Sequence, residues 1–561
     1  MIRSMNILVF LLLSPPLLLE GIGMKIPREY FLLYYLFIPF LFIPFTLHQS
    51  ALRIPPLFFI CTLLYICAVN IASFFFSLDK QVSIYSFFFY CSLILIFIFF
   101  YNHQKQTRRF LPYIILFFNV LFIAYSLCIP YFQSHNLKIL MPFMEKQVVF
   151  PTYSPHNHLG DFLGLGLVVL LIKSISTNRF MLWTGFFILF IFFILSFSRS
   201  SYVAFGVVFI LFLFFERKKI GRSYLLLGSI VLSVLLIILA ISSSRLSKTT
   251  SSLDTLSTTV NTVVQIIPRD LISQRNVFAQ QALFSAQKYP FGIGAGNFVL
   301  ASLRYNWRND ISDSAHNIFL EQLAENGIPA TIFIIMLATL LVVNALRFPS
   351  LPGYLFLYLL VNFQTDYTYQ IYIFSIFATI LTASFYYEKK EIHISVTGYV
   401  LPTLLLSFIA TQILLSNYLT QQNRFQEALT INPLNKLAYI GALQQSKYNE
   451  PLIKQALSIA PYDIGITLAA INQYMKNGQK MNALELYERA FDANHLLNFG
   501  VVKELYFLKR EVRGTAIAQA FLKRIIFIYK RGSISEEFRK EINAFCKKVG
   551  IKECKKAGWR M

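Results

Sequence analysis

Charged residues are scarce in this chain of 561 amino acids. Asp, Glu, Lys and Arg together make up 14% of it, against 56% hydrophobic residues. Soluble domains carry about a quarter charged residues, so the composition excludes an ordinary soluble protein. Apolar runs of about 18–22 residues are long enough to cross a bilayer as helices. The sequence therefore predicts an all-α, polytopic membrane protein.

Acidic residues and metal-binding motifs are also few. Asp and Glu number 27 against 50 Lys and Arg, which leaves a net charge of +23. In a membrane protein such an excess collects in cytoplasmic loops, so nucleic-acid binding is not expected. The six cysteines form no CxxC motif and no Cys/His cluster, and we expect neither a metal site nor a cofactor. Segment 503–560, with sixteen basic and six acidic residues, is typical of a solvated surface or one drawn to anionic headgroups, with acidic glycans as the alternative.

About 12–13 membrane helices are predicted, because apolar runs recur along the chain with short polar connections between them. The runs lie near residues 5–23, 30–47, 55–76, 82–101, 110–130, 157–173, 180–197, 201–215, 223–242, 328–346, 351–365, 370–387 and 396–418. The first lacks a small-x-small cleavage site, so we expect a retained span and not a signal peptide. The basic connections 104–109, 216–222 and 388–391 fall on one side, which predicts the cytoplasmic side. The long loop at about 243–326 and the chain from 419 onward are then extracytoplasmic.

The segment after residue 418 has a rhythm of its own. Ala428, Ala456 and Ala490 recur in similar contexts, and the last spacing, thirty-four residues, is the period of tetratricopeptide repeats. This predicts a small helical-repeat domain that docks partners, with an unrelated helical domain as the alternative. The expected domains are N-terminal transmembrane helices at 1–150, a catalytic membrane domain at 151–418, and the tetratricopeptide-like domain at 419–561.

Two cysteines, Cys546 and Cys554, lie in this last segment. They are eight residues apart, which is too far for a disulfide along one continuous helix. An extracytoplasmic location favours pairing. A pair would need a bend in the chain between them, and we expect it at Gly550.

Two arginines are candidates for binding an anion, and the first occupies a place that arginine usually avoids. Arg199 lies between two apolar runs with no room for a loop, on the predicted outer side. A guanidinium there either snorkels as a structural group or binds an anion. Arg275 lies in the long polar segment, on a predicted amphipathic helix at 274–287. The sequence "FGIGAGNF" follows this helix, and its glycines fit a turn as well as a phosphate cradle.

A histidine, His316, opens the segment "HNIFLEQLAENGI". Asp313 or Ser314 is the expected N-cap, which would place His316 in the first turn of a surface helix that ends at Gly327. A helix N-terminus disfavours the imidazolium, so the ring would stay neutral and able to accept a proton. The alternative is a histidine that bonds only to the nearby backbone.

Together these segments resemble the O-antigen ligase and polymerase superfamily. The resemblance rests on "SR" at 198–199, "YPFGIGAGNF", "HNIFLEQLAENGI" and "SPHNHLGDFL", and it covers roughly residues 153–387. It implies an inverting, metal-independent glycosyltransferase in the bacterial cytoplasmic membrane. Such an enzyme moves a glycan on the outer face, from an undecaprenyl-diphosphate carrier to an acceptor hydroxyl.

The resemblance also assigns roles to residues. Arg199 and Arg275 match arginines that hold the diphosphate, and His316 matches the histidine that activates the acceptor. Asn157 and Asn317 join the substrate-binding set. The acceptor can be a lipid, a glycan or a protein, and the helical tail can dock a protein partner. Ligase, polymerase and protein O-oligosaccharyltransferase share these motifs, while a membrane transporter and a non-catalytic scaffold are alternatives from other classes.

Overall fold

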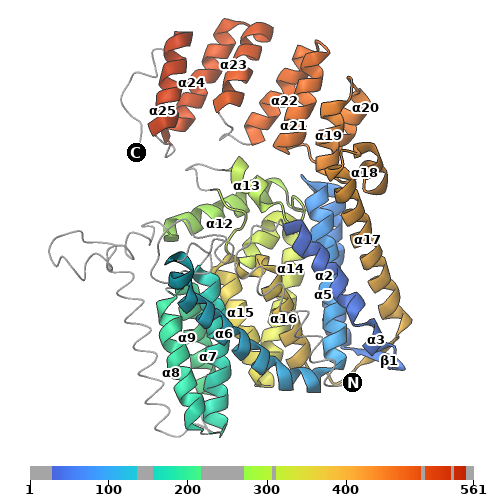
Figure 1. The fold of residues 1–561 in the computed structure, drawn as a ribbon, viewed down its shortest axis with the longest axis vertical. Coiled ribbons are helices and arrows are strands. Elements are labelled where there is room, and N and C mark those ends of the chain that lie inside the picture. Colours follow the sequence, from blue (N-terminus) through green and yellow to red (C-terminus); the bar gives the residue numbers. More distant parts are fainter. Residues whose placement is uncertain are drawn as a thin grey trace, which may run out of the picture.

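The computed structural model of the chain describes residues 28–134, 156–177, 179–196, 198–216, 271–305, 311–493, 499–531 and 536–550. Within this part the protein is an all-α polytopic membrane protein, apart from two short strands (Figure 1). Seven of the described helices are long and apolar enough to cross a membrane: Pro56–Phe76, Lys80–Asn102, Gln104–Ala124, Leu159–Thr177, Arg199–Glu216, Ile318–Arg347 and Thr397–Gln421. Shorter apolar helices occupy Leu33–Thr46, Phe180–Leu195 and Tyr372–Phe385.

The predicted apolar runs correspond closely to helices. Runs 5–23 and 223–242 lie outside the described residues, and each of the others coincides with helical structure. The membrane helices are α2 (Arg28–Leu41), α3 (Ile43–Thr46), α4 (Pro56–Ile71) continued by η1 (Ala72–Phe76), α5 (Lys80–Asn102), α6 (Gln104–Ser134), α7 (His156–Thr177), α8 (Phe180–Leu195), α9 (Arg199–Glu216), α14 (Ile318–Arg347), α15 (Leu351–Thr365), α16 (Tyr372–Phe385) and α17 (Thr397–Gln421).

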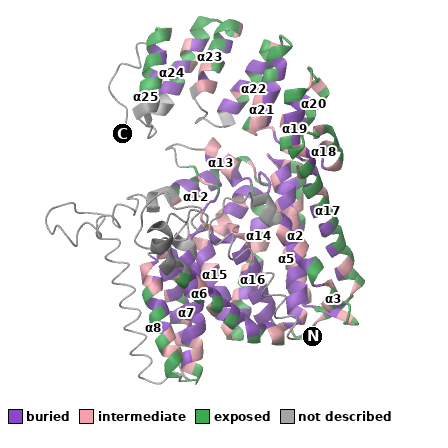
Figure 2. Cartoon of the chain, in the orientation of Figure 1, coloured by how far each residue is buried: buried purple, intermediate pink, exposed green. Residues whose placement is uncertain are grey.

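Large apolar side chains cover the outside of this bundle as well as its core. On α14, for example, Ile335, Met336 and Val343 are exposed, and Figure 2 shows exposed residues along the outer surfaces of several helices. Exposed apolar stripes on long helices are what a lipid environment requires, since no water is present there to disfavour them. The burial pattern therefore agrees with a bundle whose sides face lipid.

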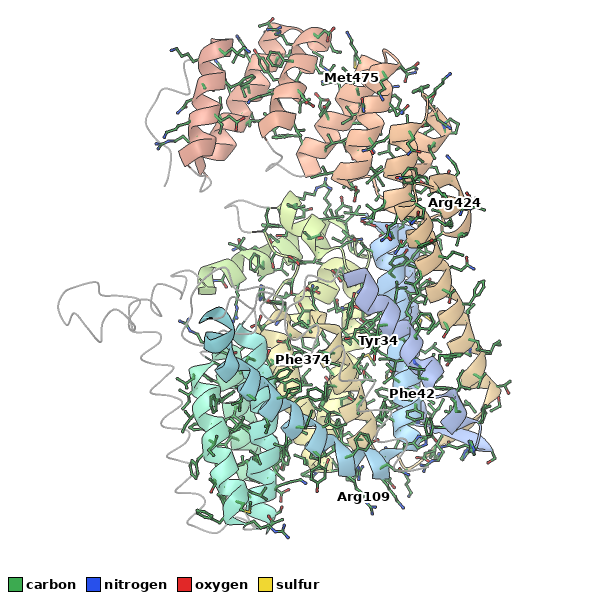
Figure 3. The ribbon with its side chains drawn as sticks, viewed as in Figure 1. Tyr34, Phe42, Arg109, Phe374, Arg424 and Met475 are labelled. Carbon is green, nitrogen blue, oxygen red and sulfur yellow. The ribbon has the colours of Figure 1, made fainter. Side chains whose placement is uncertain are left out.

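One end of the bundle, called the basic face here, gathers basic connections. Gln104 donates to the Tyr386 carbonyl at 3.1 Å and Arg108 to the Ser384 carbonyl at 2.5 Å, so the start of α6 meets the end of α16. Strands β1 (Ala51–Ile54) and β2 (Ile392–Ser395) pair antiparallel at this end. Connections 104–109 and 388–391 thus share a face, as predicted, and Figure 3 shows Arg109 there.

The opposite end, called the tail face, carries the rest of the chain. Helix α12 (Leu271–Lys288) and helix α13 (Phe298–Arg304) lie at this end (Figure 1). The short 3-10 helix η3 (Tyr367–Gln370) bonds to the turn before α14, where Gln370 donates to the Asp313 carbonyl. Helix α12 confirms the amphipathic helix predicted at 274–287. Helix α17 rises from β2 to the tail face, where the C-terminal helices begin (Figure 1).

The tail consists of short helices with their own apolar core. They are α18 (Phe425–Ile431), α19 (Lys436–Gln445), α20 (Glu450–Ile459), α21 (Ile464–Lys476), α22 (Lys480–Ala493), α23 (Phe499–Arg513), α24 (Thr515–Arg531) and α25 (Glu536–Val549). They follow one another in an arc over the tail face (Figure 1). Ala428, Ala456 and Ala490 are all buried, as helix packing at a small residue requires. The assignment to tetratricopeptide repeats stays a prediction.

The end of α25 bears on the predicted disulfide. The helix ends at Val549, and Gly550 has a positive φ of 77°, so the chain changes direction where the bend was expected. Cys546 is disulfide-bonded. The side chain of Cys554 lies outside the described residues, so its identity as the partner stays a prediction.

Candidate active site

The turn that carries His316 lies directly before α14. His316 has a positive φ of 54°, a conformation that costs a residue with a Cβ about 1–2 kcal/mol. Its backbone N–H donates to the Ser314 hydroxyl at 3.0 Å. The Ala315 N–H donates to the Glu321 carboxylate at 3.0 Å, and Gln370 donates to the Asp313 carbonyl at 2.9 Å. A strained turn that is fixed from several sides is a common feature of functional sites.

Helix α14 starts later than expected. Its N-cap is Asn317, whose side-chain oxygen accepts from the N–H groups of Phe319 and Leu320 at 3.0 and 3.1 Å. The prediction of Asp313 or Ser314 as the cap was therefore wrong, because both residues lie in the turn that precedes Asn317, where the Ser314 hydroxyl accepts from the His316 N–H. His316 directly precedes the helix and does not lie in its first turn, where it had been expected. The predicted break was correct, since Gly327 interrupts α14 with φ 76° and ψ −177°.

A carboxylate, Asp366, orients the His316 ring. Its Oδ1 lies 3.2 Å from His316 Nδ1. Asp366 is fully buried, whereas the side chain of His316 is 19% exposed. An ionised carboxylate only accepts hydrogen bonds, so it keeps the proton on Nδ1 and leaves the lone pair on Nε2. His316 Nε2 has no partner among the described residues, so it can accept a proton from a bound molecule.

Aromatic rings fix the imidazole from two further sides. Phe278 of α12 stacks on it with ring centroids 5.3 Å apart and planes 15° apart. Tyr367 of η3 meets it edge-on at 5.0 Å. The ring is therefore held by three separate segments: α12, the turn before α14, and the junction of α15 with η3.

Asp366 also joins this site to the start of α9. Ser200 Oγ donates to Asp366 Oδ2 at 3.3 Å. The next residue, Ser201, donates to Asp161 of α7 at 2.7 Å, and Thr368 of η3 donates to the other oxygen of Asp161 at 2.6 Å. Arg199, the first residue of α9, directly precedes these two serines. The structure thus brings Arg199 to the edge of the His316 cluster.

Arg275 enters the same region from α12. It lies three residues before Phe278, so the two side chains share a face of the helix. Its Nε atom is buried and has no hydrogen-bond partner in the described structure. Buried donors are nearly always paired in folded proteins, so an unpaired guanidinium nitrogen on the helix that packs against His316 suits an anionic ligand.

A comparison with protein families matches residues 184–335 to the O-antigen ligase family model. This stretch is similar to an O-antigen ligase domain. The match includes Arg199, Arg275 and His316 but stops before Asp366. Comparisons with curated proteins and with solved structures gave no match.

The two remaining predicted site residues are Asn317 and Asn157. Asn317 donates to the Gln364 carbonyl at 3.1 Å in addition to capping α14, so both ends of its amide are engaged within the protein. Asn157 is the second residue of α7, and its side chain lies outside the described part. Asp161, one turn further along α7, is the residue that reaches the cluster, and the sequence reading missed it.

The glycine segment of the matched stretch forms a turn around the break in α14. Glu325 accepts from the N–H groups of Gly296 and Phe298 at 2.8 and 2.9 Å. A Cβ on Gly327 would lie 2.4 Å from the Pro290 carbonyl oxygen. Of the two uses left open for these glycines, the structure thus supports the turn, because backbone donors that a phosphate would need already have partners.

Proposed function

We propose that the protein transfers a glycan from an undecaprenyl-diphosphate carrier to an acceptor hydroxyl at the tail face, without a metal ion. One observation carries the proposal. His316, oriented by the buried Asp366, stacks on Phe278 of α12, and the same helix carries Arg275, whose buried Nε has no partner in the described structure. His316 and Arg275 both lie in the stretch that matches the O-antigen ligase family. Transfer from a diphosphate carrier needs these two functions: a base for the hydroxyl and fixed positive charge for the leaving group.

His316 acts as the general base in this proposal. Its Nε2 takes the proton of the acceptor hydroxyl as the oxygen attacks the anomeric carbon, and the bond from that carbon to the diphosphate oxygen breaks. Asp366 stabilises the imidazolium that forms, through the bond at 3.2 Å. The proton then passes to solvent. One displacement of this kind inverts the anomeric centre.

Arg199 and Arg275 hold the diphosphate. A guanidinium presents a fork of donors that matches phosphate oxygens and stays charged at any physiological pH. These charges neutralise the departing diphosphate, which is the task a metal ion performs in other phosphate chemistry. Asn317 holds the turn before α14 and in this proposal positions His316 instead of binding substrate. Asn157 keeps its proposed place near the substrate, at the entrance of α7.

We place the tail face outside the cytoplasm. The connections 104–109 and 388–391 lie together at the opposite end of the bundle, and basic loops are retained in the cytoplasm. The reaction then takes place on the outer side of the bacterial cytoplasmic membrane, where the helical tail is also located and can meet a protein partner.

The acceptor separates three variants of this function. An O-antigen ligase uses a lipid acceptor, a polymerase uses another lipid-linked glycan, and a protein O-oligosaccharyltransferase uses a protein. A transporter is less favoured, because the polar cluster is gathered at one end of the bundle, whereas transporters bind near the midplane. A gene deletion followed by profiling of lipid-linked glycans distinguishes the first two. Loss of a ligase leaves polymerised glycan on its carrier, and loss of a polymerase leaves single repeat units.

A further inference from the structure

A large cavity lies inside the bundle, apart from the His316 cluster. Its volume is about 720 Å³, within the range of small-molecule sites, and helices α4, α5, α14, α16 and α17 form most of its wall. His316, Asp366, Arg199 and Arg275 do not line it. Glu321 and Tyr369 line it and are bonded to each other at 2.5 Å. They also hold the His316 turn, because the Ser314 hydroxyl bonds to Tyr369 and the Ala315 N–H donates to Glu321. The cavity therefore adjoins the His316 turn, but the residues proposed for catalysis do not line it.

The cavity is long and mostly apolar. Along α5 it extends from Gln81 to Phe97, sixteen residues that rise about 24 Å in an α-helix. About 720 Å³ spread over that length is narrow, as an extended chain requires. The end nearer the basic face is lined by Phe58, Phe97 and Leu341. Burial of a hydrocarbon chain there is favourable by about 0.8 kcal/mol for each CH₂ group removed from water.

The end at the tail face is polar. Its polar mouth is formed by Gln81 of α5 with Asn417, Thr420 and Gln421 of α17, and Leu437 of α19 adds a residue from the tail. Among the residues that the structure describes, no Lys, Arg or His lines the cavity. Lys436, next to Leu437 in the chain, is paired with Asp79 and Asp463 at 2.5 and 3.1 Å.

Two carboxyl groups in the wall offer nothing to a negatively charged head. Glu321 accepts from Tyr369 and from Gln370, the latter at 2.8 Å, and Glu325 accepts from two backbone N–H groups. Their oxygens act as acceptors, and a phosphate is itself an acceptor. A phosphate at this end would meet no cation among the described lining residues, whereas hydroxyl or amide groups can bond to the glutamine and asparagine side chains.

We infer that this cavity binds an amphiphile with one long apolar chain in the bundle and an uncharged, hydroxyl- or amide-rich head at the polar mouth. The ligand lies between the membrane helices and the first helices of the tail. The inference depends only on the cavity and not on the chemistry assigned to His316.

The test uses the full-length protein in phosphatidylcholine vesicles with a trace of photoreactive lipid. One probe is a single-chain monohexosyl glycerolipid with a diazirine in its acyl chain, and the other is the single-chain (lyso) form of phosphatidylglycerol with the same chain. The labelled peptides are mapped by mass spectrometry. We expect the glycolipid to label the cavity face of α16, at Ser375 and Thr379, several-fold more strongly than phosphatidylglycerol does.

Two tryptophan variants of α14 provide the matched comparison. Ile334 lines the cavity, whereas Met336, two residues away, is 49% exposed on the outer surface. Ile334→Trp should reduce glycolipid labelling of α16 several-fold, and Met336→Trp should leave it unchanged. Equal labelling by both lipids in every variant would mean only surrounding bilayer lipid and would overturn the inference. Loss of both labels in Ile334→Trp would overturn the selectivity for an uncharged head.

A second pair of variants changes charge without filling space. Gln421 lies at the polar mouth, and the neighbouring Gln422 is exposed and does not line the cavity. Gln421→Lys should shift labelling toward phosphatidylglycerol, because it supplies the missing cation, and Gln422→Lys should not. An unchanged lipid preference in Gln421→Lys would contradict the assigned position of the head. All these readouts are binding measurements, so they stand even if the proposed glycan transfer fails.

Discussion

At the scale of single residues, the proposed role of His316 as a base requires that one of its ring nitrogens is free to accept a proton. Replacement by alanine removes the proton acceptor while the turn around it keeps its bonds to Glu321 and Gln370. We expect His316→Ala to lower glycan transfer by about 10²–10⁴-fold, the usual contribution of a general base. The measurement is turnover of a lipid-diphosphate-linked glycan by purified protein. His393→Ala, an exposed histidine on β2 at the basic face, is the control, and full turnover in His316→Ala would contradict the base assignment.

Asp366 is a positioning residue in this scheme. In Asp366→Asn the amide can donate to Nδ1 instead of accepting from it, which favours the tautomer with the proton on Nε2. We expect kcat to fall with little change in KM for the donor, because the arginines are untouched. Thr365→Ser, at the adjacent position, is the control. An unchanged kcat would show that the ring does not depend on this carboxylate.

The two arginines should not tolerate lysine. Arg199→Lys and Arg275→Lys keep the charge but lose the two-pronged donor geometry. We expect each to reduce transfer by about 10²–10³-fold, as for loss of one preorganised donor to a developing anion, with weaker donor binding. Arg347→Lys, at the far end of α14, is the control. Normal turnover and donor affinity in both variants would exclude a diphosphate clamp at these positions.

If those arginines neutralise the diphosphate, the reaction should not depend on divalent metals. We expect the rate of the purified protein to stay unchanged after treatment with EDTA and dialysis. Restoration of a lost rate by Mg²⁺ or Mn²⁺ would require a mechanism in which a metal supplies part of the charge.

The residues of this site differ in how far the sequence could reveal them. His316 and Arg199 stood out because each is a polar residue close to long apolar runs, and Arg275 stood out only together with them and through the family resemblance. Asp366 met the same criterion, since "QTDYTYQ" separates the runs at 351–365 and 370–387 with almost no loop. It was missed because its partner, His316, lies fifty residues away in the sequence. Such pairing depends on the packing of α9, α14 and α15, which a single sequence does not display.

At the scale of elements, the break in α14 and the glycine turn depend on each other. The Ile328 N–H donates to the Pro290 carbonyl at 2.9 Å, and the Gly294 N–H donates to the Glu325 carbonyl at 2.7 Å. A Cβ at Gly327 would lie 2.4 Å from that Pro290 oxygen, in a conformation with φ of 76°. The break and the turn therefore have to form together.

Gly327→Ala tests this dependence. We expect a lower melting temperature and loss of transfer, because the clash displaces the first part of α14 and with it Glu321, which holds the His316 turn. Left-handed backbone alone costs alanine about 1–2 kcal/mol. Gly206→Ala on α9 is the matched control, since nothing lies within 4 Å of its added Cβ. Equal melting temperatures for the two variants would contradict a coupled break and turn.

The elements show where hydropathy suffices and where it does not. Membrane helices could be placed from apolar runs, because length and hydrophobicity alone decide whether a segment fits the bilayer. Helix α14 was placed correctly but its start was not. Ser314 had the residue type of a cap, yet its hydroxyl bonds to Tyr369, fifty-five residues further along the chain. Local capping rules cannot anticipate a competitor that arrives from another helix.

At the scale of the whole molecule, the tail is fastened to the membrane bundle. Lys436 of α19 forms ion pairs with Asp79, the N-cap of α5, and with Asp463 of the tail. Burial lowers the pKa of Lys436, but the two carboxylates together raise it by more, so the pKa lies above the ordinary lysine value. This contribution to stability is fully present at neutral pH and is lost only as pH rises through the raised pKa.

Removal of this charge should loosen the tail. In Lys436→Met, Asp79 and Asp463 lose their shared partner, so we expect faster proteolytic cleavage between α17 and α19. Lys454→Met is the control, because Lys454 is 71% exposed and pairs only with Glu450 on its own helix. Cleavage at equal rates in both variants would contradict the fastening role.

Truncation after about residue 418 removes this junction together with the tail. It should spare transfer to a simple acceptor if all the chemistry lies in the bundle.

The orientation of the molecule in the membrane decides whether the proposed reaction is an outer-face reaction at all. Arg109 and Arg424 mark the basic face and the tail region in Figure 3. In a background without the free cysteines, we expect Arg424→Cys to react with a membrane-impermeant maleimide in intact cells, and Arg109→Cys to react only after the cells are opened. Arg424 is exposed and pairs only with Glu427 three residues away, so its replacement costs little. The disulfide at Cys546 favours the same orientation, since disulfides persist in oxidising compartments. The reverse labelling pattern would place the His316 cluster in the cytoplasm, and the proposed outer-face transfer would fail with it.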